Sequence, residues 1–202
     1  LEFRRVLFRS LELRHPIVEC LLDRMAELKL NVLHLHLSDD QGWRLALDSR
    51  PRLAEHASDS AALGDAGGCY SRADWQRILD AAASRHITVI PEFDVPGHTH
   101  AVGLAYPEIA HPPVISAELQ ETAAQFGGGL PVAGRAYTGF GVGFSSLRIG
   151  DVETSAFLRD VFTELAALTP GPYLHVGGDE ALGTSRDDYD AAIAEVTAFV
   201  AS

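Results

Sequence analysis

Two acidic residues stand next to each other in the stretch PYLHVGGDEA at 172–181. Asp179 and Glu180 follow a short apolar run and two glycines, and glycine lets a backbone turn sharply or approach a ligand closely. Carboxylates presented at the end of a strand can transfer protons or stabilise a developing charge. The structural alternative is a helix start, where acids in the first turn complement the helix dipole. The position after a strand-like run favours a catalytic role for the two acids over a helix start.

A second group of ionisable residues lies in HLHLSDDQGWR at 34–44. His34 and His36 are two residues apart, so in a strand both point to the same face. Followed by Asp39 and Asp40, they offer the imidazole and carboxylate donors that zinc accepts. Two histidines make only half of a tetrahedral site, and a hydrogen-bonded core histidine is the alternative.

A third group occurs in PEFDVPGHTH at 91–100. It contains Glu92, Asp94, His98 and His100, and the Pro-Gly pair predicts a turn that redirects His98. Ionisable groups at this density favour perturbed pKa values and acid-base catalysis. A loop with solvated acids is the alternative.

The elements around these groups alternate between helix and strand. Apolar spacing predicts helices and short apolar runs predict strands. The predicted helices cover 17–30, 72–85, a segment capped by Asp151, and 187–200; the predicted strands cover 31–37, 87–94 and 173–177. Such alternation indicates an α/β fold with a parallel sheet, and all three ionisable groups follow strands. Carboxyl ends of parallel strands are the usual place for an active site. The long Gly/Pro-rich stretch from Pro96 to Gly150 is predicted to be a functional loop.

Composition excludes several classes of function. The 202-residue chain has a formal charge of -12, which disfavours nucleic acid and anionic lipid as partners. It contains two cysteines, too few for a disulfide framework, and no phosphate-binding glycine motif. Residues 1–10 lack the features of a signal peptide and are either a foreign or junction segment or a short basic strand. The cellular compartment stays open.

Aromatic side chains could stack on the face of a sugar. Trp75 lies at helical spacing with Ile78 and Leu79, which indicates a core position. Trp43 follows a glycine in a loop and is the better candidate for contact with a ligand.

Four segments in order resemble the catalytic domain of family 20 glycoside hydrolases, the β-N-acetylhexosaminidases, especially the actinobacterial members: LNVLHLHLSDDQGWRL, PEFDVPGHTHA, YTGFGVGFSSL and LAALTPGPYLHVGGDEA. The resemblance covers residues 17–200. It implies a (β/α)8 barrel and removal of terminal N-acetylglucosamine or N-acetylgalactosamine from β-linked conjugates. It also implies retention through attack by the substrate's own acetamide, with no metal or other cofactor.

The resemblance implies a role for each matched site residue. Glu180 would be the general acid and then the base, and Asp179 would orient the acetamide. Asp39 and His98 would form a network beside Glu180. Arg14 resembles the arginine that binds the sugar hydroxyls, although its spacing to the next motif is shorter than the family pattern by about four residues, or one helical turn.

Length indicates an incomplete barrel. A complete barrel takes about 250 residues, and residues 11–202 correspond to roughly its first half. We therefore expect poor stability and negligible hydrolysis from these residues alone. Two other hypotheses remain: a metal-dependent hydrolase of amidohydrolase type, for which His-x-His at a strand end is typical, and a non-catalytic sugar-binding remnant.

Overall fold

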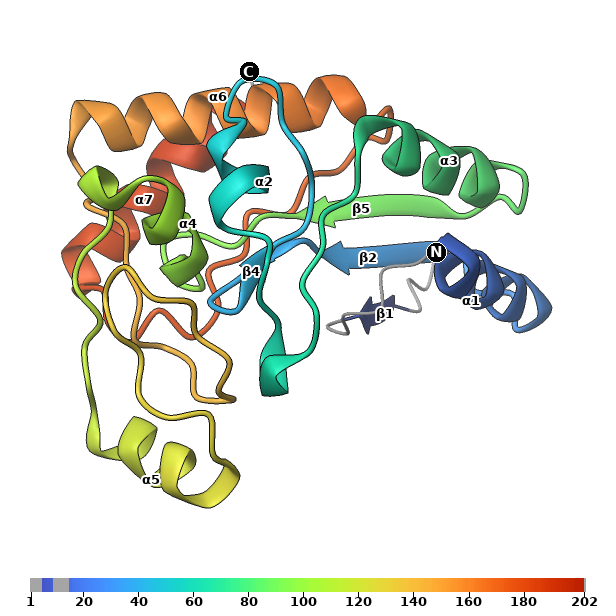
Figure 1. Cartoon of the computed structure of the whole chain (residues 1–202). Coiled ribbons are helices and arrows are strands. Elements are labelled where there is room, and N and C mark those ends of the chain that lie inside the picture. Colours follow the sequence, from blue (N-terminus) through green and yellow to red (C-terminus); the bar gives the residue numbers. More distant parts are fainter. Residues whose placement is uncertain (1–4, 9–14, 202) are drawn as a thin grey trace.

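A parallel sheet forms the centre of the protein. The computed structural model describes residues 5–8 and 15–201. The sheet order is β1 (Arg5–Phe8), β2 (Val32–His36) and β5 (Thr88–Glu92), with parallel neighbours throughout (Figure 1). The predicted strands at 31–37 and 87–94 are confirmed over Val32–His36 and Thr88–Glu92, which pair residue for residue.

The predicted third strand at 173–177 is only partly formed. His175 makes an isolated parallel bridge with Glu92 instead of a regular ladder. The His175 N–H donates to the Pro91 carbonyl at 3.0 Å, and the Val95 N–H donates to the Val176 carbonyl at 3.1 Å. The segment therefore runs beside β5, and it stops pairing where Gly177 takes a left-handed conformation.

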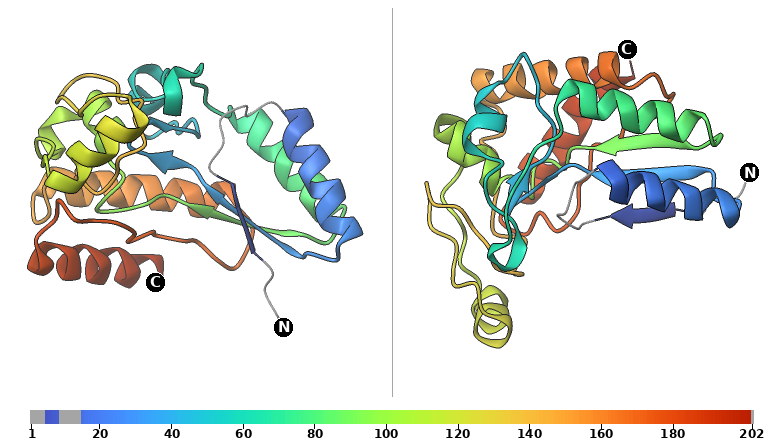
Figure 2. Two further views of the ribbon diagram at one scale, coloured as in Figure 1. Left: turned by 90° about the horizontal axis from the view of Figure 1, so that it is seen from below. Right: turned by 45° about the vertical axis from the view of Figure 1, so that its right-hand side comes forward.

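Four of the helices were predicted from the sequence. They are α1 (His15–Glu27), α3 (Arg72–Ala83), α6 (Val152–Leu168) and α7 (Arg186–Val200). Ser71 and Asp74 form a reciprocal capping box at the start of α3. Asp151 occupies the cap position of α6, but its side chain makes no capping hydrogen bond there. Helices α1 and α3 pack together, as do α6 and α7 (Figure 2).

Long loops leave the carboxyl ends of β2 and β5. The first holds the small hairpin of β3 (Ser38–Asp39) and β4 (Gly42–Trp43), then α2 (Arg52–His56) and η1 (Ala62–Gly64). The second holds α4 (His100–Ala105), η2 (Pro107–Ile109) and α5 (Ala117–Phe126). Helix α5 projects away from the sheet (Figure 1). The predicted long loop therefore contains short helices.

The two faces of β2 have different chemistry. Leu33 and Leu35 belong to the main hydrophobic core together with side chains of α1 and α3. His34 and His36 alternate with them, so they occupy the other face of the strand. The apolar face thus anchors the sheet to its helices, and the opposite face is free to carry ionisable groups.

Trp43 is part of the core, which corrects the prediction that it contacts a ligand. Its side chain is 2% exposed and stacks on Phe93, with ring centroids 4.2 Å apart. Its indole N–H donates to the Leu45 carbonyl at 2.5 Å. Trp75 is a core residue, as predicted.

Cys20 and Cys69 are both free thiols. Within residues 5–8 and 15–201, no helix combines the length and apolar character that crossing a membrane requires.

Candidate active site

The segment that presents Asp179 and Glu180 has an unusual backbone. Gly177 and Gly178 have φ values of 72° and 104°, and Glu180 has a φ of 45°, which is rare for a residue with a side chain. The Gly178 N–H donates to Asp94 Oδ1 at 2.7 Å, and a side chain at Gly177 would collide with the same carboxylate. Asp179 and Glu180 are consequently turned out of the sheet and are both exposed.

His98 lies in a tight turn beside this segment. Its φ is 52° and its side chain is completely buried. Gly97 permits the close approach of the two loops, since a Cβ there would lie 3.0 Å from the Asp179 carbonyl oxygen and 3.1 Å from the Ala181 Cα. His98 therefore lies in a turn directly after Pro96 and Gly97, as the sequence predicted.

The predicted residues Asp39, His98 and Glu180 come together in space. His98 Nδ1 lies 2.7 Å from Asp39 Oδ1, and His98 Nε2 lies 3.3 Å from Glu180 Oε2. Asp94 Oδ2 lies 3.9 Å from the same Nε2. A carboxylate that faces a buried imidazole in this way is suited to proton transfer.

Charges around His98 favour its protonated form. Burial opposes protonation, but the hydrogen bond and charge of Asp39 outweigh it and raise the pKa of His98 to about 9. Burial would raise the pKa of Asp39, yet hydrogen bonds from His36 and His98 hold it well below its usual range. Burial raises the pKa of Asp94 to about 7. Asp39 and His98 therefore form an ion pair at neutral pH.

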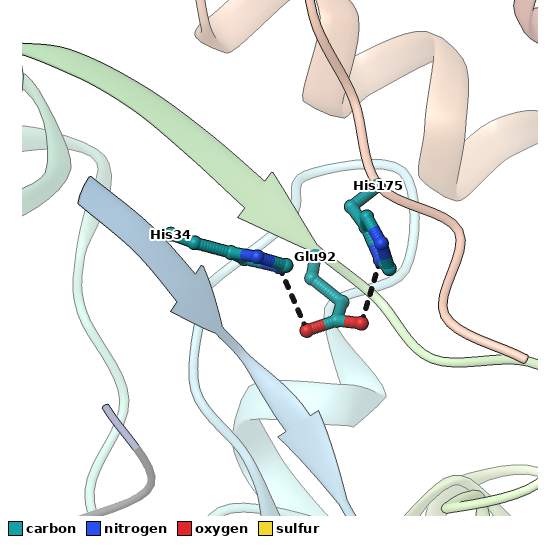
Figure 3. Close-up of side chains that lie close together, drawn as sticks. All are labelled: His34, Glu92 and His175. Atoms are coloured by element: carbon teal, nitrogen blue, oxygen red, sulfur yellow. Dashed lines mark ion pairs between the residues drawn. The ribbon is translucent and has the colours of Figure 1, made fainter. Parts of the chain in front are cut away.

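A second cluster lies deeper, on the histidine face of β2. Glu92 is buried, and its Oε2 lies 2.9 Å from His34 Nε2 and 3.0 Å from His36 Nδ1. Its Oε1 lies 2.7 Å from His175 Nδ1 (Figure 3). Burial would raise the pKa of Glu92, but His34 and His36 hold it well below its usual range. Glu92 is thus a buried anion surrounded by imidazoles.

Donor types alone would allow a metal at this cluster, because the nearest atoms of His34, Glu92 and His175 lie within 4.8 Å of one another. His34 Nε2 and Glu92 Oε2 lie 2.9 Å apart, and His175 Nδ1 and Glu92 Oε1 lie 2.7 Å apart. Tetrahedral zinc with bonds of about 2.0–2.1 Å would hold its donor atoms further apart. The arrangement therefore fits direct carboxylate–imidazole contacts better than a metal site.

Two other predicted residues have structural roles. Asp40 is buried, and its Oδ1 accepts hydrogen bonds from the His100 N–H at 3.0 Å and the Ser145 hydroxyl at 2.5 Å. His100 turns into the long loop, where its Nε2 lies 2.8 Å from the Arg135 carbonyl oxygen. Arg14 lies outside the described residues.

One contribution to the site, that of His175, was not predicted, because its segment was expected only to form an apolar strand. Asp94 belongs to the ionisable group predicted at 91–100, and its raised pKa agrees with that prediction. The alternation of Leu174, His175 and Val176 is the same pattern that places His34 on the inner face of β2. That alternation is the signal that could have identified His175.

Comparison with known proteins identifies the family. The model of the glycosyl hydrolase family 20 catalytic domain matches residues 13–198. The beta-N-acetylhexosaminidase of Cellulomonas fimi is 44% identical over 172 residues, which are 85% of this chain and 31% of that protein. A beta-hexosaminidase of Porphyromonas gingivalis is 35% identical over 79% of this chain and 18% of its own length. The chain thus spans less than a third of either relative.

Solved structures agree with this result. A family 20 beta-N-acetylglucosaminidase superposes with a TM-score of 0.89 at 49% identity, covering 98% of this chain and 40% of that one. The Streptomyces plicatus N-acetyl-beta-hexosaminidase, solved in complex with thio-NAglucal, gives a TM-score of 0.84 at 43% identity over 98% of this chain and 37% of that one. The chain belongs to glycosyl hydrolase family 20.

Proposed function

We propose that the protein of which these residues form the catalytic site hydrolyses terminal β-linked N-acetylhexosamine with retention of configuration. The observation that carries the proposal is the contact of Glu180 with the buried Asp39–His98 ion pair, next to Asp179. Members of this family use the substrate's acetamide oxygen as the nucleophile, so no second enzyme carboxylate has to attack the anomeric carbon.

Glu180 serves first as a general acid and then as a general base in this proposal. Its carboxyl group gives a proton to the leaving oxygen, and the resulting carboxylate later removes a proton from water. His98, held by Asp39, fixes the Glu180 carboxyl group and supplies positive charge next to it. The exposed position of Glu180 leaves it accessible to a sugar.

Asp179 orients the acetamide. Its carboxylate accepts a hydrogen bond from the acetamide nitrogen, which turns the carbonyl oxygen towards the anomeric carbon and stabilises the cationic ring that forms. Adjacent acids on a backbone turned by two glycines can thus act on different parts of one sugar. N-acetylglucosamine and N-acetylgalactosamine are the proposed substrates.

We further propose that the described sheet is part of a (β/α)8 barrel. The parallel strands occur in chain order, each followed by a helix. Glu180 is 48% exposed, so the described residues do not enclose a sugar bound there. The 202 residues alone are therefore expected to give negligible hydrolysis.

The test compares two substrates with the complete gene product. One is an aryl N-acetyl-β-glucosaminide, and the other is the matched β-glucoside without the acetamide. The proposal predicts rapid release from the first, negligible release from the second, and a β-configured first product by NMR. Equal rates on both substrates would refute substrate assistance.

Membership of family 20 argues against the metal-dependent amidohydrolase alternative. A non-catalytic sugar-binding remnant predicts a different outcome of the same test. In that case N-acetylglucosamine binds in calorimetry, and neither substrate is hydrolysed by the complete gene product.

A further inference from the structure

A row of alternating carboxylates and imidazoles connects the deep cluster to Glu180 through two hydrogen bonds, His36–Glu92 and His98–Asp39, and two longer contacts of 3.3 and 3.4 Å. Glu92 Oε2 lies 3.0 Å from His36 Nδ1, and His36 Nε2 lies 3.4 Å from Asp39 Oδ2. Asp39 Oδ1 lies 2.7 Å from His98 Nδ1, and His98 Nε2 lies 3.3 Å from Glu180 Oε2. The inner end of the row is fully enclosed, since Glu92 is 1% exposed.

The register of the sheet creates the inner end of this row. His36 on β2 is the direct partner of Glu92 on β5, and Glu92 bridges to His175 on the next segment. Partners at one level of a parallel sheet point to the same face. The side chains of His36, Glu92 and His175 therefore form a line across the sheet. Glu92 also contacts His34, and Figure 3 shows His34 and His175 on either side of the Glu92 carboxylate.

The chemistry of the row requires protons at particular atoms. A carboxylate only accepts hydrogen bonds, and a neutral imidazole has a single N–H donor. His36 faces a carboxylate oxygen at each ring nitrogen, with a hydrogen bond to Glu92 at Nδ1 and a longer contact of 3.4 Å to Asp39 at Nε2, so only its doubly protonated form presents an N–H to both. Burial opposes this form, but Asp39 and Glu92 outweigh it and raise the pKa of His36 to about 10.

We propose that Glu92 is a positioning residue for the reaction at Glu180. Its buried carboxylate keeps His36 doubly protonated, and His36 then holds Asp39 as the anion that orients His98 against Glu180. This inference rests on the proposed glycosidase function. It assigns a task to Glu92 and His36, two buried residues that act through Asp39 and His98.

Among the described residues, the ionisable groups that face Glu92 or His36 enter this balance, including His98, whose ring centroid lies 5.6 Å from that of His36. His34 and His36 approach from β2, and His175 approaches from the segment beside β5. Asp94, two residues further along the chain, contributes repulsion. Loss of the Glu92 charge removes one of the two anions that stabilise the His36 cation, so His36 then releases its proton at a lower pH.

The first test uses Glu92→Gln in the complete gene product with N,N'-diacetylchitobiose. We expect kcat to fall about 10-fold, the size typical of lost outer contacts to a site histidine, with KM nearly unchanged. The alkaline limb of kcat/KM should move to lower pH by about one pH unit. Glu92→Asp, which keeps the charge, should show a smaller fall in kcat and a smaller shift of the alkaline limb than Glu92→Gln. A wild-type pH profile in a folded Glu92→Gln protein would overturn the proposal.

Glu164→Gln is the matched control. Glu164 is also a carboxylate with a largely covered side chain, and it accepts backbone hydrogen bonds from Asp48 and Ser49 at 2.8 Å, outside the row. The same chemical change there should leave the pH profile unmoved. An equal shift in both variants would mean that the effect is general and would count against the proposal.

A second measurement needs no folded Glu92 variant. The complete gene product labelled with 15N-histidine should show both ring nitrogens of His36 protonated at pH 8, with the signal assigned by its loss in His36→Gln. Titration of His36 near pH 6.5 would overturn the proposal. This readout is independent of turnover, so it separates failure of the row from failure of the proposed function.

Discussion

His98 and Glu180 come from loops at the ends of different strands, yet His98 Nε2 lies 3.3 Å from Glu180 Oε2. The other ring nitrogen of His98 lies 2.7 Å from Asp39. A buried imidazole held by an anion on one side can present a fixed N–H to the carboxyl group on the other. This contact relates the fold to the proposed chemistry.

Replacement of Asp39, the anion that holds His98, should lower kcat more than it changes KM. In Asp39→Asn the side chain keeps its shape but loses the charge that holds His98, so we expect kcat to fall on the order of 10²-fold with KM little changed. Steady-state kinetics of the complete gene product on N,N'-diacetylchitobiose measure this. Asp65→Asn, at an exposed loop carboxylate, is the control, and a wild-type kcat for Asp39→Asn would contradict the prediction.

Stability should fall as the pH rises above neutrality. Burial lowers both pKa values, but Asp39 raises the pKa of His98 to about 9, and Asp39 with Glu92 raises the pKa of His36 to about 10, both above the ordinary 6.5. The folded protein thus keeps protons that the unfolded chain releases. The stabilisation is complete below about pH 6.5 and is lost as the pH rises through these values.

Urea unfolding of the complete gene product at pH 7 and pH 9 measures this loss. We expect a decrease in the free energy of unfolding of about 1–3 kcal/mol. The decrease should be smaller in Asp39→Asn, where the histidines have lost a shared anion. An identical decrease in both proteins would show that other groups cause it.

Gly97 should be needed for activity because it lets two loops meet. In Gly97→Ala the new Cβ would lie 3.0 Å from the Asp179 carbonyl oxygen, so the segment carrying Glu180 has to move. A small displacement of reacting groups is costly, and we expect kcat to fall about 10-fold or more. Gly68→Ala is the control, since nothing lies within 4 Å of a Cβ there. Equal rates for the two variants would contradict this account.

Trp43 should contribute to stability and not to sugar binding. Trp43→Phe removes the hydrogen bond to the Leu45 carbonyl and part of the stacking on Phe93. We expect the free energy of unfolding to fall by about 1–3 kcal/mol with KM unchanged. A tenfold higher KM at unchanged stability would restore the original prediction of ligand contact.

Local patterns predicted the elements better than they predicted contacts. The alternation of leucine and histidine in β2 identified one apolar and one ionisable face, and strand ends identified where Asp39, His98 and Glu180 would gather. Trp43 was misassigned because its partner Phe93 is distant in the sequence. The contacts among His36, Glu92 and His175 depend on strand register, which no single segment contains.

The 173–177 segment shows a related limit. Its apolar run predicted a strand, but a regular ladder also depends on the path of the backbone beyond it. The left-handed glycines Gly177 and Gly178 turn the chain towards Asp94 and end the pairing. Gly177 and Gly178 thus shorten the strand and also present Asp179 and Glu180.

The rate of N-acetylglucosamine release from N,N'-diacetylchitobiose by the complete gene product and its Glu180→Gln variant tests the central claim most directly. The leaving sugar is a poor leaving group, so protonation by Glu180 has to matter. The account predicts a loss of about 10²–10⁴-fold in kcat with the fold intact. A Glu180→Gln variant that cleaves chitobiose at the wild-type rate would contradict it.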